Sequence, residues 1–295
     1  MVLLSGTARL LALTFLVSTM LLIGMRAGVT GLRALRAARS LALRTILANL
    51  VVAPLLGFAC IRLLPVPRES AAAIVLLACL PGGLAAVQFT SKVKGQGALP
   101  GAMLVVLNIL ALLISPVILR ILLPAGESLA IPYGRALLFL GLTILIPLAV
   151  GMLLCDQAPR ATAILARPLA VLGMLAFVAF TLVTKSFRKE AVSGIGAAAA
   201  IAMLLFILTT MAAGWLLGGP ARETRQLLAT ATSMRNPALC LAIAKCTPAG
   251  TAVIPALVAF SLLMVPPNML FTVCNGIRSR RAAARSKEAR KGEPS

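Results

Sequence analysis

The chain has 295 residues, of which 60% are hydrophobic, and its mean hydropathy is +1.03. A soluble domain is about half apolar, so this composition excludes water as the main solvent. The net charge of +21 raises the alternative of nucleic-acid binding. Most of the 28 Lys and Arg residues, however, stand between long apolar runs or in the C-terminal tail. That distribution is typical of membrane loops that attract anionic lipid, and we expect no nucleic-acid partner.

The titratable residues exclude most enzyme and metal chemistry. The sequence has no histidine, and its six cysteines form no CxxC pair. None of the seven acidic residues falls in the interior of a long apolar stretch, since Glu69 and Glu223 stand at the first or second position of theirs. Metal ligands, a general base and an intramembrane proton relay therefore lack the residues that they need. We expect neither an enzyme nor a resident metal or cofactor, and we interpret the cysteines as packing residues.

Nine apolar stretches approach or exceed the roughly 20 residues that a helix needs to cross a bilayer. The first is not followed by the small-residue cleavage site of a signal peptide, so we count it as a span. The segment 276–295 is basic and poor in apolar residues, and we expect it to be a disordered tail. The predicted spans are 8–25, 41–63, 69–91, 98–123, 133–154, 161–184, 192–218, 222–244 and 250–274.

The basic residues orient these spans. Alternate loops and the tail carry about twice as many Lys and Arg residues as the opposite side, and the richer side faces the cytoplasm. The N-terminus is therefore expected outside and the C-terminus inside a bacterial-type cytoplasmic (inner) membrane. The richer loops contain Arg26, Arg33, Arg36, Arg39 and Arg44, then Lys92 and Lys94, then Arg160 and Arg167, then Arg222 and Arg225.

Two of the predicted spans are interrupted at matching places. The third contains Pro81-Gly82-Gly83, and the eighth contains Arg235-Asn236-Pro237. The nine predicted spans form a first group of four, about 8–123, and a second group of five, about 133–274. Each interrupted span is the last but one of its group. Paired broken helices in two halves are a sequence signal for the binding site of a transporter, although ordinary helix kinks are the alternative. The pattern predicts an all-α polytopic inverted-repeat transporter within residues 1–275.

These residues resemble the bile acid:sodium symporter family. Ala78-Cys79-Leu80-Pro81-Gly82-Gly83, with Lys94-Gly95-Gln96 after it, is similar to a family motif, as is Ser233-Met234-Arg235-Asn236, and Asn268 falls where the family carries an asparagine. The resemblance covers most of the chain from Gly24 onward. It implies two inverted five-helix repeats, the first lacking its initial helix, arranged as a panel and a core domain with two broken helices that cross.

The chain departs from the family at the sodium ligands that the resemblance implies. Side chains without a ligand oxygen stand at the corresponding positions, and Arg235 replaces a glutamine. Asn49 alone keeps a plausible oxygen. Sodium is therefore possible, but we expect the usual sodium sites to be absent. The positions without an oxygen ligand are Ala86, Val87, Pro100, Leu104 and Ala231.

Arg235 is the one charged residue in the interior of the eighth apolar stretch, beyond Arg222, Glu223 and Arg225 at its start, and a charge there costs about 2.5–3.5 kcal/mol on insertion scales. It either attracts an organic anion in place of a bound cation or bonds the carbonyls freed by the helix breaks, and both roles are compatible. The surrounding polar side chains either orient a ligand or join helices. The candidate binding residues are Asn49, Gly82, Gly83, Gln88, Thr90, Thr232, Ser233, Arg235, Asn236 and Asn268.

The leading functional hypothesis is a secondary carrier for a small organic anion that does not use the family's usual sodium sites. Bile acids, keto acids, sulfonated compounds and pantothenate-like molecules are all candidate substrates. The competing hypotheses are a membrane protein that binds or regulates without transporting, and a passive channel.

Overall fold

The fold is helical throughout the part of the chain that the computed structural model describes. Those residues are 6–81, 98–122, 138, 141–183, 195–237, 240–241, 244 and 250–291. The candidate residues Gly82, Gly83, Gln88 and Thr90 lie outside them. The elements are α1 (Gly6–Ala37), α2 (Arg39–Leu47), η1 (Ala48–Val52), α3 (Ala53–Leu63), α4 (Arg68–Cys79), α6 (Leu99–Leu122), η2 (Gly141–Leu145), α8 (Ile146–Gln157), α9 (Pro159–Val183), α11 (Gly196–Leu217), α12 (Arg222–Ser233), α14 (Gly250–Leu263) and α15 (Val265–Lys291).

Several of these helices are long and apolar enough to cross a membrane. Five such segments occur in the described residues, and they overlap five of the predicted spans. Two shorter apolar helices, Leu99–Ala111 and Gly141–Gln157, overlap two more. A membrane protein built of helices is thus confirmed, while the total of nine spans stays a prediction. The five segments are Leu10–Ala37, Arg39–Leu63, Pro159–Phe180, Gly196–Leu217 and Ala252–Arg278.

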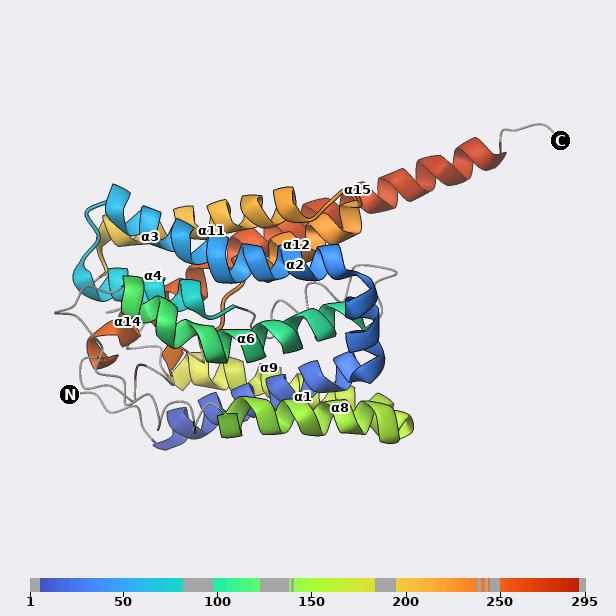
Figure 1. Cartoon of the computed structure of the whole chain (residues 1–295), viewed down its shortest axis with the longest axis horizontal. Coiled ribbons are helices and arrows are strands. Elements are labelled where there is room, and N and C mark those ends of the chain that lie inside the picture. Colours follow the sequence, from blue (N-terminus) through green and yellow to red (C-terminus); the bar gives the residue numbers. More distant parts are fainter. Residues whose placement is uncertain are drawn as a thin grey trace.

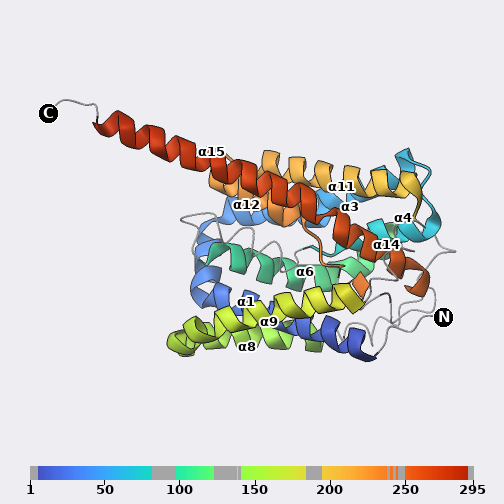
Figure 2. The same cartoon turned by 180° about the vertical axis from the view of Figure 1, so that it is seen from behind.

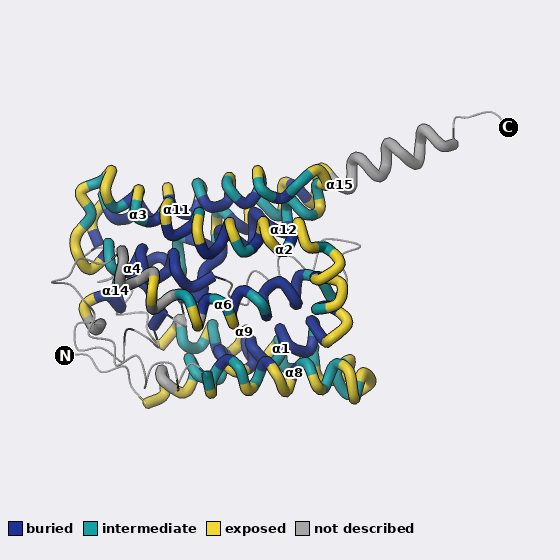
Figure 3. The backbone as a smooth tube through the Cα atoms, in the orientation of Figure 1, coloured by how far each residue is buried: buried dark blue, intermediate teal, exposed yellow. Residues whose placement is uncertain are grey.

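The outer faces of these helices carry large apolar side chains. Ile164 and Leu175 of α9 are 72% and 60% exposed, and Leu216 of α11 is 78% exposed. Figure 3 shows exposed residues along the outer helices and buried ones toward the centre. A soluble monomer rarely exposes apolar surface on this scale, whereas hydrocarbon chains cover it without cost.

The helices form two outer groups with a middle group between them (Figure 1). Helix α1 packs along α8, α9 and α6, and α11 packs along α12 and α3. Helix α4 lies against α3 and α14, between the two groups, and the view from behind gives the same order (Figure 2). The connection from α1 to α2 therefore joins one outer group to the other.

Paired glycines allow α1 and α8 to approach closely. A Cβ atom on Gly24 would lie 2.2 Å from the Leu148 carbonyl oxygen, and one on Gly151 would lie 2.2 Å from the Leu21 carbonyl oxygen. Small residues promote helix association in membranes because backbones can then touch. The contact between α1 and α8 therefore depends on the absence of side chains at both positions.

Helix α1 bends at Gly28, where φ is +54°, a value that favours glycine. The bend leaves the backbone N–H of Val29 without its helical acceptor. Both carboxylate oxygens of Asp156 accept from this N–H, at 3.2 and 2.9 Å. An acidic side chain thus caps the second part of α1, in keeping with the preference of helix N-termini for negative charge.

The C-terminal segment differs from the sequence-based expectation. Residues 276–291 continue α15 as a helix to Lys291, where the composition predicts disorder, and Figures 1 and 2 show this helix leaving the body of the protein. The difference has a physical reason, because Ala, Arg, Lys and Glu dominate the segment and all are strong helix formers.

The glycine contact generates a stability prediction. Gly24→Ala and Gly151→Ala should each destabilise the protein by about 1–3 kcal/mol, because the added methyl group meets backbone that cannot rotate away. The expected measurement is a lower Tm of the detergent-solubilised protein. Gly276→Ala is the matched control, because a Cβ there meets nothing within 4 Å. Unchanged melting of both core variants would show that α1 and α8 are not held by this contact.

Candidate functional site at the helix crossing

The two interrupted helices have the same length and begin alike. Helices α4 and α12 are each 12 residues long. Each starts with Arg-Glu followed by a hydroxyl residue, Ser70 in α4 and Thr224 in α12. They end at Cys79 and Ser233. The two interruptions therefore stand at equivalent positions of two similar helices.

The chain is extended after each helix end, and the two extended segments pair. Pro81 and Arg235 form an isolated antiparallel β-bridge, and the backbone N–H of Asn236 donates to the Leu80 oxygen at 3.3 Å. Each bridged residue stands two positions beyond the last residue of its helix. The predicted loss of regular helix is confirmed at both places within the described residues.

Helical structure resumes immediately after the second interruption, at Pro237. The Cys240 N–H donates to the Asn236 oxygen at 3.1 Å, which makes Asn236 the N-cap residue. Asparagine at the N-cap and proline at the first helical position both favour a helix start. The C-terminal ends of α4 and α12 and the N-terminal end of this next helix therefore meet at the crossing.

Arg235 lies at this meeting point and is fully buried. Its Nη1 donates to the Ala78 carbonyl oxygen at 3.4 Å, a long hydrogen bond. Ala78 belongs to the last turn of α4, whose carbonyls lack intrahelical partners. The guanidinium thus contacts the negative end of the α4 dipole, where a cation is favoured.

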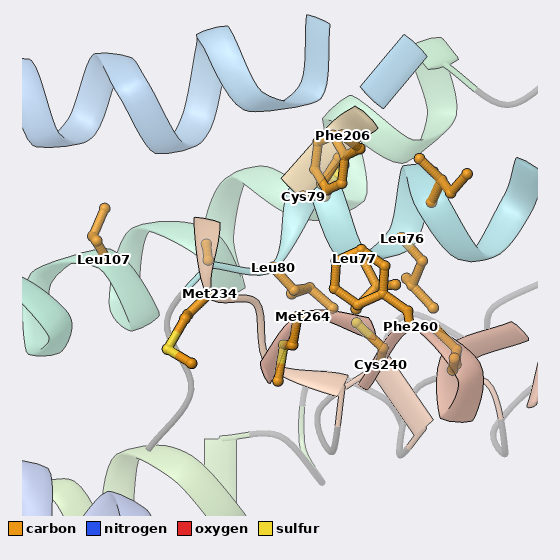
Figure 4. Packing of buried hydrophobic residues seen from close by; sticks show 14 of the residues in the cluster. Leu76, Leu77, Cys79, Leu80, Leu107, Phe206, Met234, Cys240, Phe260 and Met264 are labelled. Atoms are coloured by element: carbon orange, nitrogen blue, oxygen red, sulfur yellow. The ribbon is translucent and has the colours of Figure 1, made fainter. Parts of the chain in front are cut away.

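Helix α11 supplies an aromatic face to the same guanidinium. The Cζ atom of Arg235 lies 5.7 Å from the centre of the Phe206 ring, within the range of a cation–π contact, and Phe206 lies 6.0 Å from the Phe260 ring. Figure 4 shows Phe206 and Phe260 with buried side chains of α4 around the crossing. Phe206 was not among the predicted residues, because nothing distinguishes it from other apolar residues in its run.

One edge of the guanidinium has no hydrogen-bond partner among the described residues. The Arg235 Nε and Nη2 atoms are buried, and neither bonds to a described residue. These two nitrogens form the side-on fork that matches the two oxygens of a carboxylate. A buried donor pair without a partner is costly, which makes this edge of Arg235 the candidate ligand contact of the site.

Two further contacts gather polar side chains around the end of α12. The Ser233 hydroxyl donates to Asn268 Oδ1 at 2.6 Å, and Asn49 Nδ2 donates to Thr232 Oγ1 at 3.4 Å. Asn49 belongs to η1, a π-helical turn shortly before Pro54, and such turns occur often at functional sites. Its Oδ1 has no partner among the described residues.

The structure therefore brings most of the described candidate residues together. Thr232, Ser233, Arg235 and Asn236 follow one another at the end of α12 and its interruption, and hydrogen bonds attach Asn49 and Asn268 to them. These six residues come from η1, α12 with its interruption, and α15. Hereafter they are called the crossing site.

The residues that stand where the resemblance implies sodium ligands, Asn49 apart, have no side-chain oxygen where they are described. Ala231 lies buried in α12, and Pro100 and Leu104 lie buried in α6, while Ala86 and Val87 fall outside the described residues. Within the described residues no group of three or more His, Cys, Asp or Glu side chains is placed to hold a metal ion.

Comparison with known proteins connects this geometry to a family. Residues 13–195 match the Sodium Bile acid symporter family, a range that holds the first interruption but not the second. A protein of Bacillus subtilis (strain 168), described as "Uncharacterized sodium-dependent transporter YocS", is 31% identical over 136 residues. The aligned part is 45% of this chain and 42% of the relative, so the match spans less than half of the relative's length. Because the family match covers more than half of the residues, the chain belongs to the Sodium Bile acid symporter family.

Proposed function

We propose that the chain is a secondary carrier for a small organic anion and that the crossing site binds the anion through Arg235. The observation that carries the proposal is the Nε–Nη2 edge of a fully buried guanidinium, which bonds no described residue where the helix ends meet. Family membership and the name of the sodium-dependent relative support a transporter. The Nε–Nη2 edge of Arg235, which bonds no described residue, supports an anion as the transported substrate.

The local charge also favours an anion. The C-terminal ends of α4 and α12 each contribute about half a negative charge, and the helix start at Pro237 contributes about half a positive charge. The partial charges of these three helix ends sum to about half a negative charge. The full positive charge of Arg235 is larger than this sum. The remaining charge of about half a positive unit attracts a carboxylate, sulfonate or phosphate.

The two roles considered for Arg235 are compatible on one side chain. Nη1 bonds Ala78 and helps to hold the crossing, while the opposite edge bonds no described residue and is open to substrate. Arginine permits this division because its donors point in fixed directions in one plane. A bound anion would then contact the residue that joins both interrupted helices.

The inverted repeat is the architecture that we propose for this carrier. Helices of equal length, the similar starts Arg68-Glu69 and Arg222-Glu223, and a bridge between equivalent positions all support a pseudo-two-fold relation. In this arrangement one outer group of helices acts as the panel and the other belongs to the core. Complete burial of Arg235 requires the groups to move apart before an anion can enter.

A second candidate is a sodium-coupled carrier, which the description of the Bacillus subtilis relative favours. The buried Asn49 Oδ1 supports a sodium site directly. It is the one described side-chain oxygen of the crossing site among the buried atoms without a hydrogen-bond partner. A single neutral oxygen is a weak ligand set for sodium, and Arg235 repels a cation nearby. We therefore propose that Arg235 replaces the ion, and that transport does not depend on sodium.

A passive channel and a protein that only binds or regulates have less support than a carrier. A channel needs a continuous water path, which the burial of Arg235 interrupts. A protein that only binds or regulates would keep the anion site but would not move the anion across a sealed membrane. Uptake into proteoliposomes separates such a protein from a carrier.

The anion site predicts a specific loss of binding. Arg235→Gln should weaken the best anion at least about tenfold, because a hydrogen bond to a charged group contributes roughly 1.5–3 kcal/mol. Arg235→Lys should give a smaller loss, since it keeps the charge but not the planar fork. The measurement is a thermal-shift titration of purified protein with bile acids, keto acids, sulfonates and pantothenate-like acids, because a ligand of the folded state raises Tm.

Arg167→Gln is the matched control, since Arg167 is exposed on α9 and the charge change is the same. The control should bind the anion as the parent does. Normal binding by folded Arg235→Gln would remove the substrate role. Loss of folding in both Arg235 variants would leave only the structural role.

Sodium independence is a separate prediction. Replacing sodium by choline or potassium should leave anion uptake into proteoliposomes largely unchanged, because the described positions Ala231, Pro100 and Leu104 supply no side-chain oxygen. Asn49→Ala should then show the same indifference to sodium. A steep sodium dependence that Asn49→Ala abolishes would instead establish the sodium-coupled carrier.

A further inference from the structure

A groove at the connection of α1 and α2 is lined by residues that do not belong to the crossing site. Its volume is about 370 Å³. It has an apolar wall from three helices and two arginines among its lining residues. The lining residues are Leu32, Leu35, Arg36, Arg39, Ala42, Leu43 and Val106.

The backbone explains why the groove forms there. The bend at Gly28 redirects α1, which ends at Ala37, and α2 begins at Arg39 after a one-residue turn. Buried Leu35 and Leu41 anchor the two sides of this turn in the core. Close approach of Gly31 to the Ala98 carbonyl oxygen brings α6, and with it Val106, against the turn. Helices α1, α2 and α6 therefore form the walls of the groove.

The charged residues that line the groove are both basic. Arg33, Arg36, Arg39 and Arg44 follow one another within α1 and α2, and the first acidic residue of the chain is Glu69. All four arginines are exposed. Arg36 and Arg39 differ from the other two because they line the groove. An occupant of the groove therefore meets apolar carbon on one side and two guanidinium groups on the other.

We infer that this groove binds an anionic phospholipid, with the phosphate at Arg36 and Arg39 and the start of an acyl chain along Leu32, Ala42 and Val106. A soluble anion would leave the apolar wall unused, and a zwitterionic phospholipid would bring a cationic headgroup close to the two arginines. A volume of about 370 Å³ is at the small end of ligand pockets, so it holds a headgroup region while the acyl chains extend into the bilayer. The predicted topology places the site in the cytoplasmic leaflet, where bound lipid would contact the link between the two outer groups.

The test compares two pairs of substitutions that change the charge equally. Delipidated protein in neutral detergent is titrated with phosphatidylglycerol or phosphatidylcholine, and bound lipid is measured by native mass spectrometry. The parent should bind phosphatidylglycerol more tightly. Combined Arg36→Gln and Arg39→Gln should weaken phosphatidylglycerol at least about tenfold, since each basic residue near a lipid surface adds binding energy. Combined Arg33→Gln and Arg44→Gln should weaken it less than about twofold.

Equal losses in both pairs would overturn the site in favour of diffuse attraction to a basic surface. A third variant, Ala42→Trp, fills the groove without a change of charge and should also release the lipid, and unchanged binding would contradict the inference. Glycerol 3-phosphate separates a headgroup from a lipid, because it should bind far more weakly than phosphatidylglycerol. Equal affinity for the two would make the groove a site for soluble phosphate and not for lipid. The Tm without lipid confirms that each variant is folded, and if Ala42→Trp is not, the arginine pairs decide.

Discussion

The contact between the Arg235 guanidinium and the C-terminal end of α4 is the interaction on which the rest of the crossing depends. Breaking two helices inside a membrane frees carbonyl groups that have no water to bond, and each unsatisfied group costs several kcal/mol. Arg235 offsets this cost for Ala78, while the Pro81–Arg235 bridge and the Asn236–Leu80 hydrogen bond pair the extended segments with each other. Phe206 covers the guanidinium from α11. One residue thereby ties three helices at the point where regular structure is absent.

A covalently attached cation has different consequences from a bound ion. An ion can leave on either side of the membrane, so its gradient can drive transport. Arg235 is covalently part of the chain, so it cannot leave with the substrate, and a guanidinium is not readily deprotonated in proteins. A carrier built on Arg235 would therefore gain permanent affinity for an anion. It would lose the coupling of transport to an ion gradient at that position. The anion's own gradient, or an ion bound elsewhere, would then have to supply the driving force.

Close packing joins α1 and α8 into one unit of the fold. Gly24 and Gly151 bring the backbones of these two helices into contact. The chain passes from this unit to the other outer group through the short turn between α1 and α2, next to the groove lined by Arg36 and Arg39. Lipid in that groove would lie beside the turn between α1 and α2. Membrane composition would then influence how easily the two outer groups of helices separate.

The amino-acid sequence by itself determined the membrane environment, the helical class and the places of both interruptions. Hydropathy, Pro and Gly act on their own segments, so these features are local. The sequence did not predict the helical course of residues 276–291, where charge and helix propensity oppose each other. Only the tertiary structure decided that Arg235 bonds Ala78, 157 positions away, that Phe206 lies over it, and that no described residue bonds its Nε–Nη2 edge. These contacts join backbone and side-chain groups from distant segments, and no local pattern encodes the angle at which two broken helices meet.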